Sequence, residues 1–248
     1  MPLNVPGILV LFHLLKNPRL VIPHVTVKDI RQIDFLALRN AGYRGAIFDK
    51  DNCLTIPYKD TLVPQLEDAW RECREAFGEG NVIIVSNSAG TKFDAGGIQA
   101  ESVSYHLSAP VLRHDTLKPG YSCIASTRAY FSSLRLPISD DELVVVGDRI
   151  FTDVIMANRM RSDFASSSSN APARARIGGP LAIWTDGVWQ KESMVMRWLE
   201  KRLLSMVRKW ARHGETSFVG TDIFVRELPS PQPRKTGSAL TKLLDMMR

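Results

Sequence analysis

Cysteine is scarce in this chain. Its 248 residues contain only Cys53, Cys73 and Cys123. No two of them lie at the short spacing of a zinc knuckle, and three widely separated thiols do not make a disulfide framework. The sequence therefore predicts free thiols and a reducing compartment.

Long hydrophobic runs are also missing. The apolar run at residues 7–15 is far shorter than the roughly 20 residues that a membrane-spanning helix needs. Pro18 and Pro23 prevent its extension. The run also lacks the charged start and cleavage site of a signal peptide, and the Arg/Ser-rich pattern of a transit peptide. Two roles stay open for it: a helix packed on the core or in a subunit interface, and an anchor that lies in the membrane interface.

Enough apolar residues are present, at 44% of the chain, for one sizeable domain with appended segments. The formal net charge is +6 and the sequence pI is about 9.3. Such a charge favours acidic partners, which include anionic lipid surfaces, nucleic acids and phosphate-bearing substrates. Charge alone does not choose among them.

Short apolar runs alternate with helical patterns from residue 44 onward. The expected strands are 46–48, 82–85, 110–112, 143–146 and 181–184, and the expected helices are 62–77, 97–107, 120–134 and 152–160. Strands separated by helices predict an α/β fold with a doubly wound parallel sheet, whose site lies at the carboxyl edge. We divide the chain into an N-terminal segment (1–43), a catalytic domain (44–190) with a mobile loop (162–180), a basic amphipathic helix (191–213) and a flexible tail (214–248), in which 240–247 could form a short helix.

The predicted basic helix has apolar residues at helical spacing, namely Val195, Leu199, Leu203, Met206 and Trp210. Cations lie among them: Lys191, Arg197, Lys201, Arg202, Arg208, Lys209 and Arg212. A stripe of this kind either packs on the core with a solvated back or binds a membrane surface. Both readings stay open.

Polar clusters follow the predicted strands. They are Asp49-Lys50-Asp51-Asn52-Cys53, Ser86-Asn87-Ser88, Lys118-Pro119-Gly120, and the segment from Gly147-Asp148-Arg149 to Asp153. Each cluster singly is more typical of a solvated turn or a helix cap. Because the carboxyl ends of parallel strands meet at one edge, a single site would explain all of them together. Asp49 and Asp51, two carboxylates that leave the end of a predicted strand two residues apart, suggest phosphoryl chemistry.

These clusters resemble the haloacid dehalogenase superfamily of phosphatases. The longer sequence segments at 84–90, 110–114 and 147–158 resemble those of the fungal mitochondrial phosphatidylglycerophosphatases, which make phosphatidylglycerol on the route to cardiolipin. The resemblance covers roughly residues 1–160 and resumes at 183–188. Superfamily members carry specificity caps after the first or third strand, and neither interval here has room for one. The resemblance thus implies a capless Rossmann-like domain, open to a large or membrane-embedded phosphate ester unless neighbouring subunits roof it.

The resemblance also implies roles for the acidic residues. Asp49 would attack phosphorus and form an aspartyl-phosphate, while Asp51 would protonate the leaving oxygen and later activate water. Asp49 and Asp148 would hold Mg²⁺, the backbone carbonyl of Asp51 would join them, and Asp153 would bind the ion directly or orient its ligands.

Further residues would act on the phosphoryl group. Ser86 would offer a hydroxyl, the loop beginning at Asn87 would offer backbone donors, and Lys118 would offset charge and orient Asp49. For three residues, two roles stay open, namely a structural ion pair and a contact with the substrate: Arg113, His114 and Arg149. Cys53 is expected to pack beneath the loop.

The leading hypothesis is a Mg²⁺-dependent phosphatase for phosphatidylglycerophosphate, bound peripherally to the matrix side of the inner mitochondrial membrane. Its expected partners are the anionic phospholipid substrate and the membrane surface, with no nucleic acid, and a homo-oligomer stays open. One alternative is a phosphatase of soluble sugar or nucleic-acid monoesters. A second is a membrane-surface scaffold with an inactive hydrolase fold.

Overall fold

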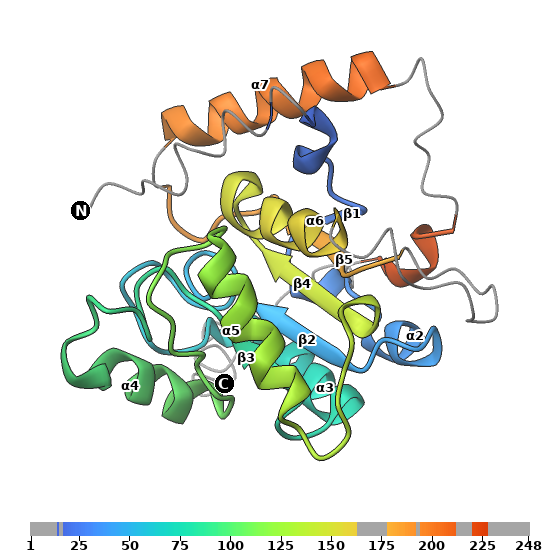
Figure 1. Ribbon diagram of the computed structural model, residues 1–248. Coiled ribbons are helices and arrows are strands. Elements are labelled where there is room, and N and C mark those ends of the chain that lie inside the picture. Colours follow the sequence, from blue (N-terminus) through green and yellow to red (C-terminus); the bar gives the residue numbers. More distant parts are fainter. Residues whose placement is uncertain (1–13, 15–16, 163–177, 192–193, 212–219, 228–248) are drawn as a thin grey trace, which may run out of the picture.

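A five-stranded, all-parallel sheet forms the centre of the computed structural model, which describes residue 14 and residues 17–162, 178–191, 194–211 and 220–227 (Figure 1). The strand order is β1-β5-β4-β2-β3. The strands are β1 (Val25–Val27), β2 (Gly45–Phe48), β3 (Val82–Ile84), β4 (Leu143–Gly147) and β5 (Leu181–Thr185). Every residue of the last four is buried, as expected for parallel strands that are covered on both faces.

Helices cover both faces of the sheet, which confirms the doubly wound prediction (Figure 1). They are α2 (Phe35–Asn40), α3 (Glu67–Phe77), α4 (Ile98–Leu107), α5 (Tyr121–Ser132), α6 (Ile155–Ser162) and α7 (Met194–Ala211). Side chains of α2, α3 and α4 belong to one core cluster, and side chains of α5, α6 and α7 belong to another. Short 3₁₀ turns occur at Pro18–Val21, Ile30–Gln32, Pro64–Leu66, Ala95–Gly97, Asp140–Glu142 and Asp222–Phe224, and a π-helical turn at Ile150–Val154.

The register of the sheet brings the ends of its middle strands together. Phe48, the last residue of β2, is paired with Ile84 of β3 and with Val146 of β4. The backbone N–H of Asp49 still donates to the carbonyl of Val146, at 2.9 Å. The residues that follow β2, β3 and β4 therefore leave the sheet at the same edge.

No inserted domain interrupts residues 17–162, which the structure describes without a gap. Between β2 and β3 the chain forms isolated bridges around Thr55, a 3₁₀ turn and α3. The expected strand at 110–112 is reduced to a single bridge between Val111 and Ile84. The next bridge joins His114 to Thr91, in the loop after β3, and the N–H of His114 donates to the carbonyl of Gly90.

The N-terminal boundary differs from the predicted one at residue 43. Val25–Val27 forms β1, which pairs with β5, and residues such as Phe35 and Leu38 are buried in the same core. The sequence hid this strand because it has only three residues and follows Pro23 closely. Of the apolar run at 7–15, only Leu14 is described, and it is buried in the core cluster that also contains Leu20 of the 3₁₀ turn at Pro18–Val21 and Leu204 of α7.

Part of the tail that we expected to be flexible is packed. Phe224 is buried against Tyr43, with ring centroids 5.9 Å apart, and Val225 bridges Ile33. The expected short helix at 240–247 and most of the mobile loop lie outside the described residues. All three cysteines are free and buried, which agrees with the expectation of unpaired thiols.

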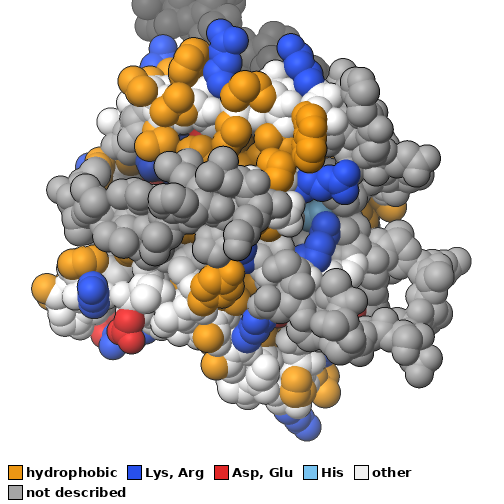
Figure 2. Space-filling model, turned by 45° about the horizontal axis from the view of Figure 1, so that its top comes forward, with side chains coloured by type: hydrophobic (Ala, Val, Ile, Leu, Met, Phe, Trp, Pro, Cys, Tyr) orange, Lys and Arg blue, Asp and Glu red, His pale blue; other side chains and the backbone are white. Residues whose placement is uncertain are grey.

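Most of the apolar stripe of α7 points away from the core. Val195, Leu199, Met206 and Trp210 are 75, 44, 60 and 65% exposed, whereas Leu203 is partly buried against the core. The reading in which the stripe packs on the core therefore holds for Leu203 and is wrong for the other four residues. Figure 2 shows hydrophobic side chains together with Lys and Arg on the face that includes α7. In the described part of the chain, no helix combines the length and the apolar character needed to cross a membrane.

Candidate active site

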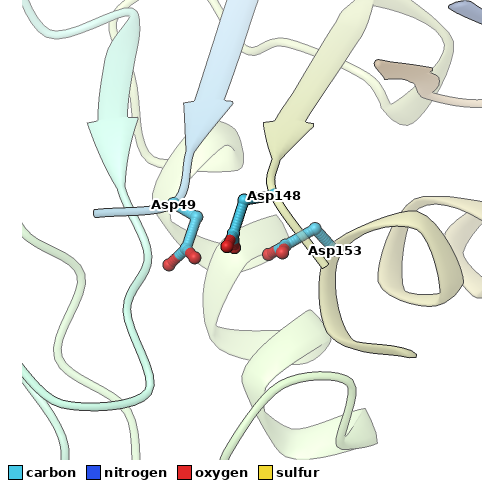
Figure 3. A group of neighbouring side chains, drawn as sticks. All are labelled: Asp49, Asp148 and Asp153. Atoms are coloured by element: carbon cyan, nitrogen blue, oxygen red, sulfur yellow. The ribbon is translucent and has the colours of Figure 1, made fainter. Parts of the chain in front are cut away.

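Three buried aspartates converge at the carboxyl edge of the sheet (Figure 3). Asp49 follows β2, Asp148 follows β4, and Asp153 lies in the π-helical turn that leads into α6. Each offers a carboxylate oxygen within 4.8 Å of the other two. Carboxylates so close repel one another, so the arrangement needs positive charge among them.

Lys118 supplies part of this charge. Its ammonium donates to Asp49 Oδ1 and to Asp153 Oδ1, both at 2.7 Å, and the residue is only 2% exposed. Burial alone would raise the pKa of Asp49, but the Lys118 ammonium, the backbone N–H of Lys50 and Arg149 together outweigh burial and lower the pKa. Burial would also lower the pKa of Lys118, yet the two carboxylates raise it well above its usual value. Lys118 is therefore held as a cation.

Asp148 has a different counter-charge. Arg197 of α7 donates to its Oδ2 and, at 3.4 Å, to its backbone carbonyl. Asp148 is 1% exposed, and its Oδ1 has no hydrogen-bond partner in the structure. Burial and the neighbouring Asp49 raise the pKa of Asp148 well above its usual value, although Arg197 opposes them.

The donor set fits a hard divalent cation. It consists of carboxylate oxygens, the ligands that Mg²⁺ prefers, and the unpartnered Oδ1 of buried Asp148 lacks the compensating contact that a buried polar atom needs. Asp153 is more fully engaged. Its Oδ2 accepts from the Thr152 hydroxyl at 2.9 Å and from the Arg149 backbone at 3.3 Å. Asp49 and Asp148 are thus the better placed to bind an ion, and Asp153 to hold Lys118.

Asp51 is fixed by three donors. Lys50 Nζ and the Tyr58 backbone N–H donate to its Oδ1 at 2.6 and 3.1 Å, and the Ser88 hydroxyl donates to its Oδ2 at 3.3 Å. Lys50 is fully buried, and its ammonium also donates to the Lys59 carbonyl. The side chain between the two aspartates thus folds inward and supports the second of them.

The loop after β3 carries Ser86 and Asn87. Ser86 is buried, and its hydroxyl oxygen lies 2.9 Å from that of Ser88 and accepts from the Ser88 backbone at 3.1 Å. Asn87 Oδ1 accepts from the Lys118 backbone at 2.6 Å, and its amide donates to the Lys118 carbonyl at 3.3 Å. Asn87 therefore fixes the backbone from which the lysine reaches the aspartates.

His114 and Arg113 lie farther along. The His114 ring is buried, with Nε2 2.9 Å from the Ser86 carbonyl and Nδ1 2.7 Å from the Thr116 carbonyl. Burial lowers its pKa, although the two carbonyls oppose the shift. These contacts favour a structural part for His114. Arg113 pairs with Glu101 at 3.5 Å on the surface, away from the aspartates.

Arg149 lies close enough to the aspartates for their charge to shift its pKa. Burial would lower its pKa, but the carboxylates of Asp148, Asp49 and Glu200 raise it. Glu200 of α7 is itself buried and accepts from the Phe151 backbone at 3.1 Å. Arg149 is therefore a half-buried cation beside the aspartates, with charge available for an anion.

Cys53 packs beneath the loop, as expected. Its sulfur lies 3.9 Å from the Val146 carbonyl, and burial raises the pKa of its thiol well above the usual value. The residues that sequence reasoning missed are Lys50 and Arg197. We had counted Arg197 among the cations of a solvated helix face, and its position in the sequence of α7 gave no indication of a contact with Asp148.

Comparison with known proteins places these residues in a family context. The family model described as mitochondrial PGP phosphatase matches residues 5–165. The chloroplastic phosphatidylglycerophosphate phosphatase 1 of Chlamydomonas reinhardtii is 41% identical over 144 residues, 58% of this chain and 51% of the relative. The chloroplastic/mitochondrial protein of the same name from Arabidopsis thaliana is 31% identical over 201 residues, 80% of this chain and 51% of the relative.

A fungal relative is matched over nearly its whole length. The probable mitochondrial phosphatidylglycerophosphatase of Schizosaccharomyces pombe is 32% identical over 216 residues, 82% of this chain and 94% of the relative. The chain spans about half the length of the algal and plant relatives. No solved structure matches it significantly.

Proposed function

The chain belongs to the mitochondrial PGP phosphatase family, and from this premise we propose that it hydrolyses the terminal phosphate monoester of phosphatidylglycerophosphate to give phosphatidylglycerol. The observation that carries the proposal is the buried Lys118 between Asp49 and Asp153, with Asp148 beside them. This arrangement supplies a carboxylate nucleophile and the charges that a phosphoryl group requires.

Asp49 is the nucleophile in this mechanism. Lys118 occupies its Oδ1 and keeps the pKa of the carboxyl low, so the group is ionised at neutral pH. An oxygen of Asp49 attacks phosphorus in line, the bond from phosphorus to the glycerol oxygen breaks, and an aspartyl-phosphate forms. Water then attacks phosphorus, releasing phosphate and restoring the carboxylate.

Asp51 carries the proton. It protonates the glycerol oxygen as it leaves, and it accepts a proton from the water that attacks the aspartyl-phosphate. Lys50, Tyr58 and Ser88 fix the orientation of this carboxyl group for both steps. Ser86, the backbone after Asn87 and the guanidinium of Arg149 bind the phosphoryl oxygens.

Asp49, Asp148 and the backbone carbonyl of Asp51 would hold Mg²⁺, and Asp153 would act mainly by fixing Lys118. When bound, the ion supplies charge that neutralises the phosphoryl oxygens. The four clusters and the parallel sheet also support a place in the haloacid dehalogenase superfamily.

The site of action in this proposal is the surface of the inner mitochondrial membrane, on its matrix side. The outward stripe of α7 supports peripheral binding, because an apolar helix face between cations suits an anionic bilayer surface. Trp198 and Trp210 are 56 and 65% exposed, and tryptophan favours the headgroup level of a bilayer.

Phosphate release from a panel of monoesters tests the activity. The panel contains phosphatidylglycerophosphate in vesicles, a sugar phosphate and a 5′-phosphorylated oligonucleotide, each with Mg²⁺, with EDTA and with Ca²⁺. We expect the lipid to be preferred, EDTA to stop release and Mg²⁺ to restore it. Ca²⁺ should substitute poorly because its coordination is larger and looser. Preference for a soluble monoester, or full activity in chelator, would refute the corresponding part of the proposal.

Vesicle flotation tests the membrane surface. Leu199→Ser and Met206→Ser change exposed side chains of the stripe, so the fold should survive. The doubly substituted protein should float less than wild type while keeping turnover on a soluble monoester. A matched control is Leu36→Ser, since Leu36 is 61% exposed on α2, away from the stripe. Unchanged flotation with an altered molecular mass would assign the stripe to a subunit interface instead.

A further inference from the structure

A groove of about 400 Å³ lies between α7 and the end of β5. Its lining contains Trp184, Asp186, Leu204 and Ser205, together with the cations Lys201, Arg208 and Lys209. None of these residues belongs to the aspartate cluster. Among the described residues of the lining, Asp186 is the one that is acidic, and it is already paired with Lys28, whose ammonium donates to its two oxygens at 2.9 and 3.1 Å. Positive charge therefore dominates the groove.

One end of the groove touches the candidate active site through Trp184. The indole N–H of this buried residue donates to the backbone carbonyl of Asp148 at 3.0 Å. The ammonium of Lys201 lies over the same ring, 5.8 Å from its centroid. Arg197, one helical turn before Lys201, pairs with Asp148 itself. The aspartate cluster and the groove thus share a wall.

We propose that this groove binds the second phosphate of the substrate, the phosphodiester that joins its two glycerol units. The inference rests on the proposed function, because a substrate with a single phosphate would leave the groove without its ligand. Arg197 and Lys201 are four residues apart, a rise of about 6 Å along a helix. The three-carbon glycerol between the two phosphates has comparable reach, so a substrate whose terminal phosphate lies beside Asp148, the partner of Arg197, is long enough to bring its phosphodiester to Lys201.

Chemistry favours a phosphodiester over a neutral headgroup. Ammonium and guanidinium groups form charge-assisted hydrogen bonds with phosphate oxygens, and the Ser205 hydroxyl at the groove can donate one more. The groove then contributes to substrate specificity. It favours a monoester that carries a second anion at the right distance, and it does not help a simple glycerol phosphate.

The test compares two soluble substrates without a bilayer. One is deacylated phosphatidylglycerophosphate, which has both phosphates and no acyl chains, and the other is glycerol 3-phosphate. Wild type should show a higher kcat/KM for the two-phosphate compound. Lys201→Gln should reduce this preference about tenfold through KM, as expected for one charged hydrogen bond. Lys201→Arg should retain the preference, and further substitution of Lys209 by Gln should reduce it more.

Arg202→Gln is the matched control. Arg202 neighbours Lys201 on α7, is equally a cation over a tryptophan ring, at 5.2 Å from Trp198, and does not line the groove. It should leave the preference unchanged. An equal effect of Arg202→Gln would overturn the proposal, because the preference would then follow net charge rather than the groove.

Three more outcomes would overturn the assignment of the groove. They are a wild type that hydrolyses the vesicular lipid without preferring the two-phosphate compound, a Lys201→Gln variant that changes only turnover on vesicles, and an equal loss on both soluble substrates. A change confined to turnover on vesicles would mean that the groove binds the headgroups of bulk lipids. An equal loss on both soluble substrates would mean that Lys201 has a structural role. A wild type inactive on the vesicular lipid itself would refute the proposed function instead.

Discussion

Replacing Lys118 by Met should remove much of the stability of the protein. The ammonium lies 2.7 Å from each of two buried carboxylates, and its side chain is 3% exposed. Removing one partner of a buried ion pair typically costs about 3–5 kcal/mol, because the remaining charge is left uncompensated. For a chain of this size, that loss corresponds to a fall in Tm of about 10 °C.

The loss should depend on pH with a definite sign. In wild type the pKa of Asp49 is lowered, so its ion pair stabilises the fold above the unfolded pKa and the benefit is lost as pH falls through the folded pKa. In the variant, burial raises the pKa values of Asp49 and Asp153 with no ammonium to oppose it. Protonation then relieves the buried charge. The difference in unfolding free energy between the two proteins should therefore narrow as pH falls from about 7.5 to about 5.

Urea unfolding followed by tryptophan fluorescence measures this difference, with EDTA and with Mg²⁺. Mg²⁺ should recover part of the loss, since it brings positive charge to the same carboxylates. The control is Arg71→Met, which removes an exposed pair with Asp68 whose side chains are 57 and 91% accessible. Such a pair contributes about 1 kcal/mol at most. A Lys118→Met variant no less stable than the control, or a difference that widens at low pH, would refute the reasoning.

Other substitutions test single contacts. Asp49→Asn should abolish phosphate release while the circular dichroism spectrum stays native, because an amide cannot attack phosphorus and Lys118 keeps its contact with Asp153. Arg197→Gln should raise the Mg²⁺ concentration for half-maximal activity about 10- to 100-fold, as loss of a residue that orients a metal ligand does. The effect should be larger at pH 6 than at pH 8, because Asp148 without Arg197 has a still higher pKa. Gly147→Ala should inactivate the protein, because the added Cβ would overlap the Asp153 side chain; full phosphate release would contradict this.

Much of the sheet could be predicted, because buried parallel strands are short apolar runs of an easily recognised kind. The strands at 46–48, 82–85, 143–146 and 181–184 all appear within about a residue of their expected bounds. The edge strand Val25–Val27 did not stand out, because three residues give too little pattern. Phe224 was also missed, since a single aromatic residue in a polar tail carries no period.

Asp49 and Asp148 were predictable because each directly follows a strand, whereas the roles of Asp153 and Lys118 were implied by the family resemblance. Arg197 was not predictable, since helical periodicity assigns apolar residues to the inside and charged ones to the outside. On α7 this rule is reversed around Arg197 and Glu200, which are buried, whereas Val195 and Leu199 are exposed. The burial of Arg197 results from a contact between residues far apart in the sequence. Buried Asp148 needs a counter-charge, and its place in the fold is not visible from the sequence of α7.

The three buried thiols give the protein its own set of chemical reporters. Cys53 lies under the loop that carries Asp51, Cys73 lies on α3, and Cys123 lies on α5, on the other face of the sheet. Burial raises the pKa of each, that of Cys123 to about 12, so the closed protein presents almost no thiolate to an alkylating reagent. Each thiol can therefore be alkylated only when the structure around it opens locally. The order in which the three sites are labelled would therefore show which region opens first, and the effect of Mg²⁺ on Cys53 alone would show how tightly the catalytic loop closes.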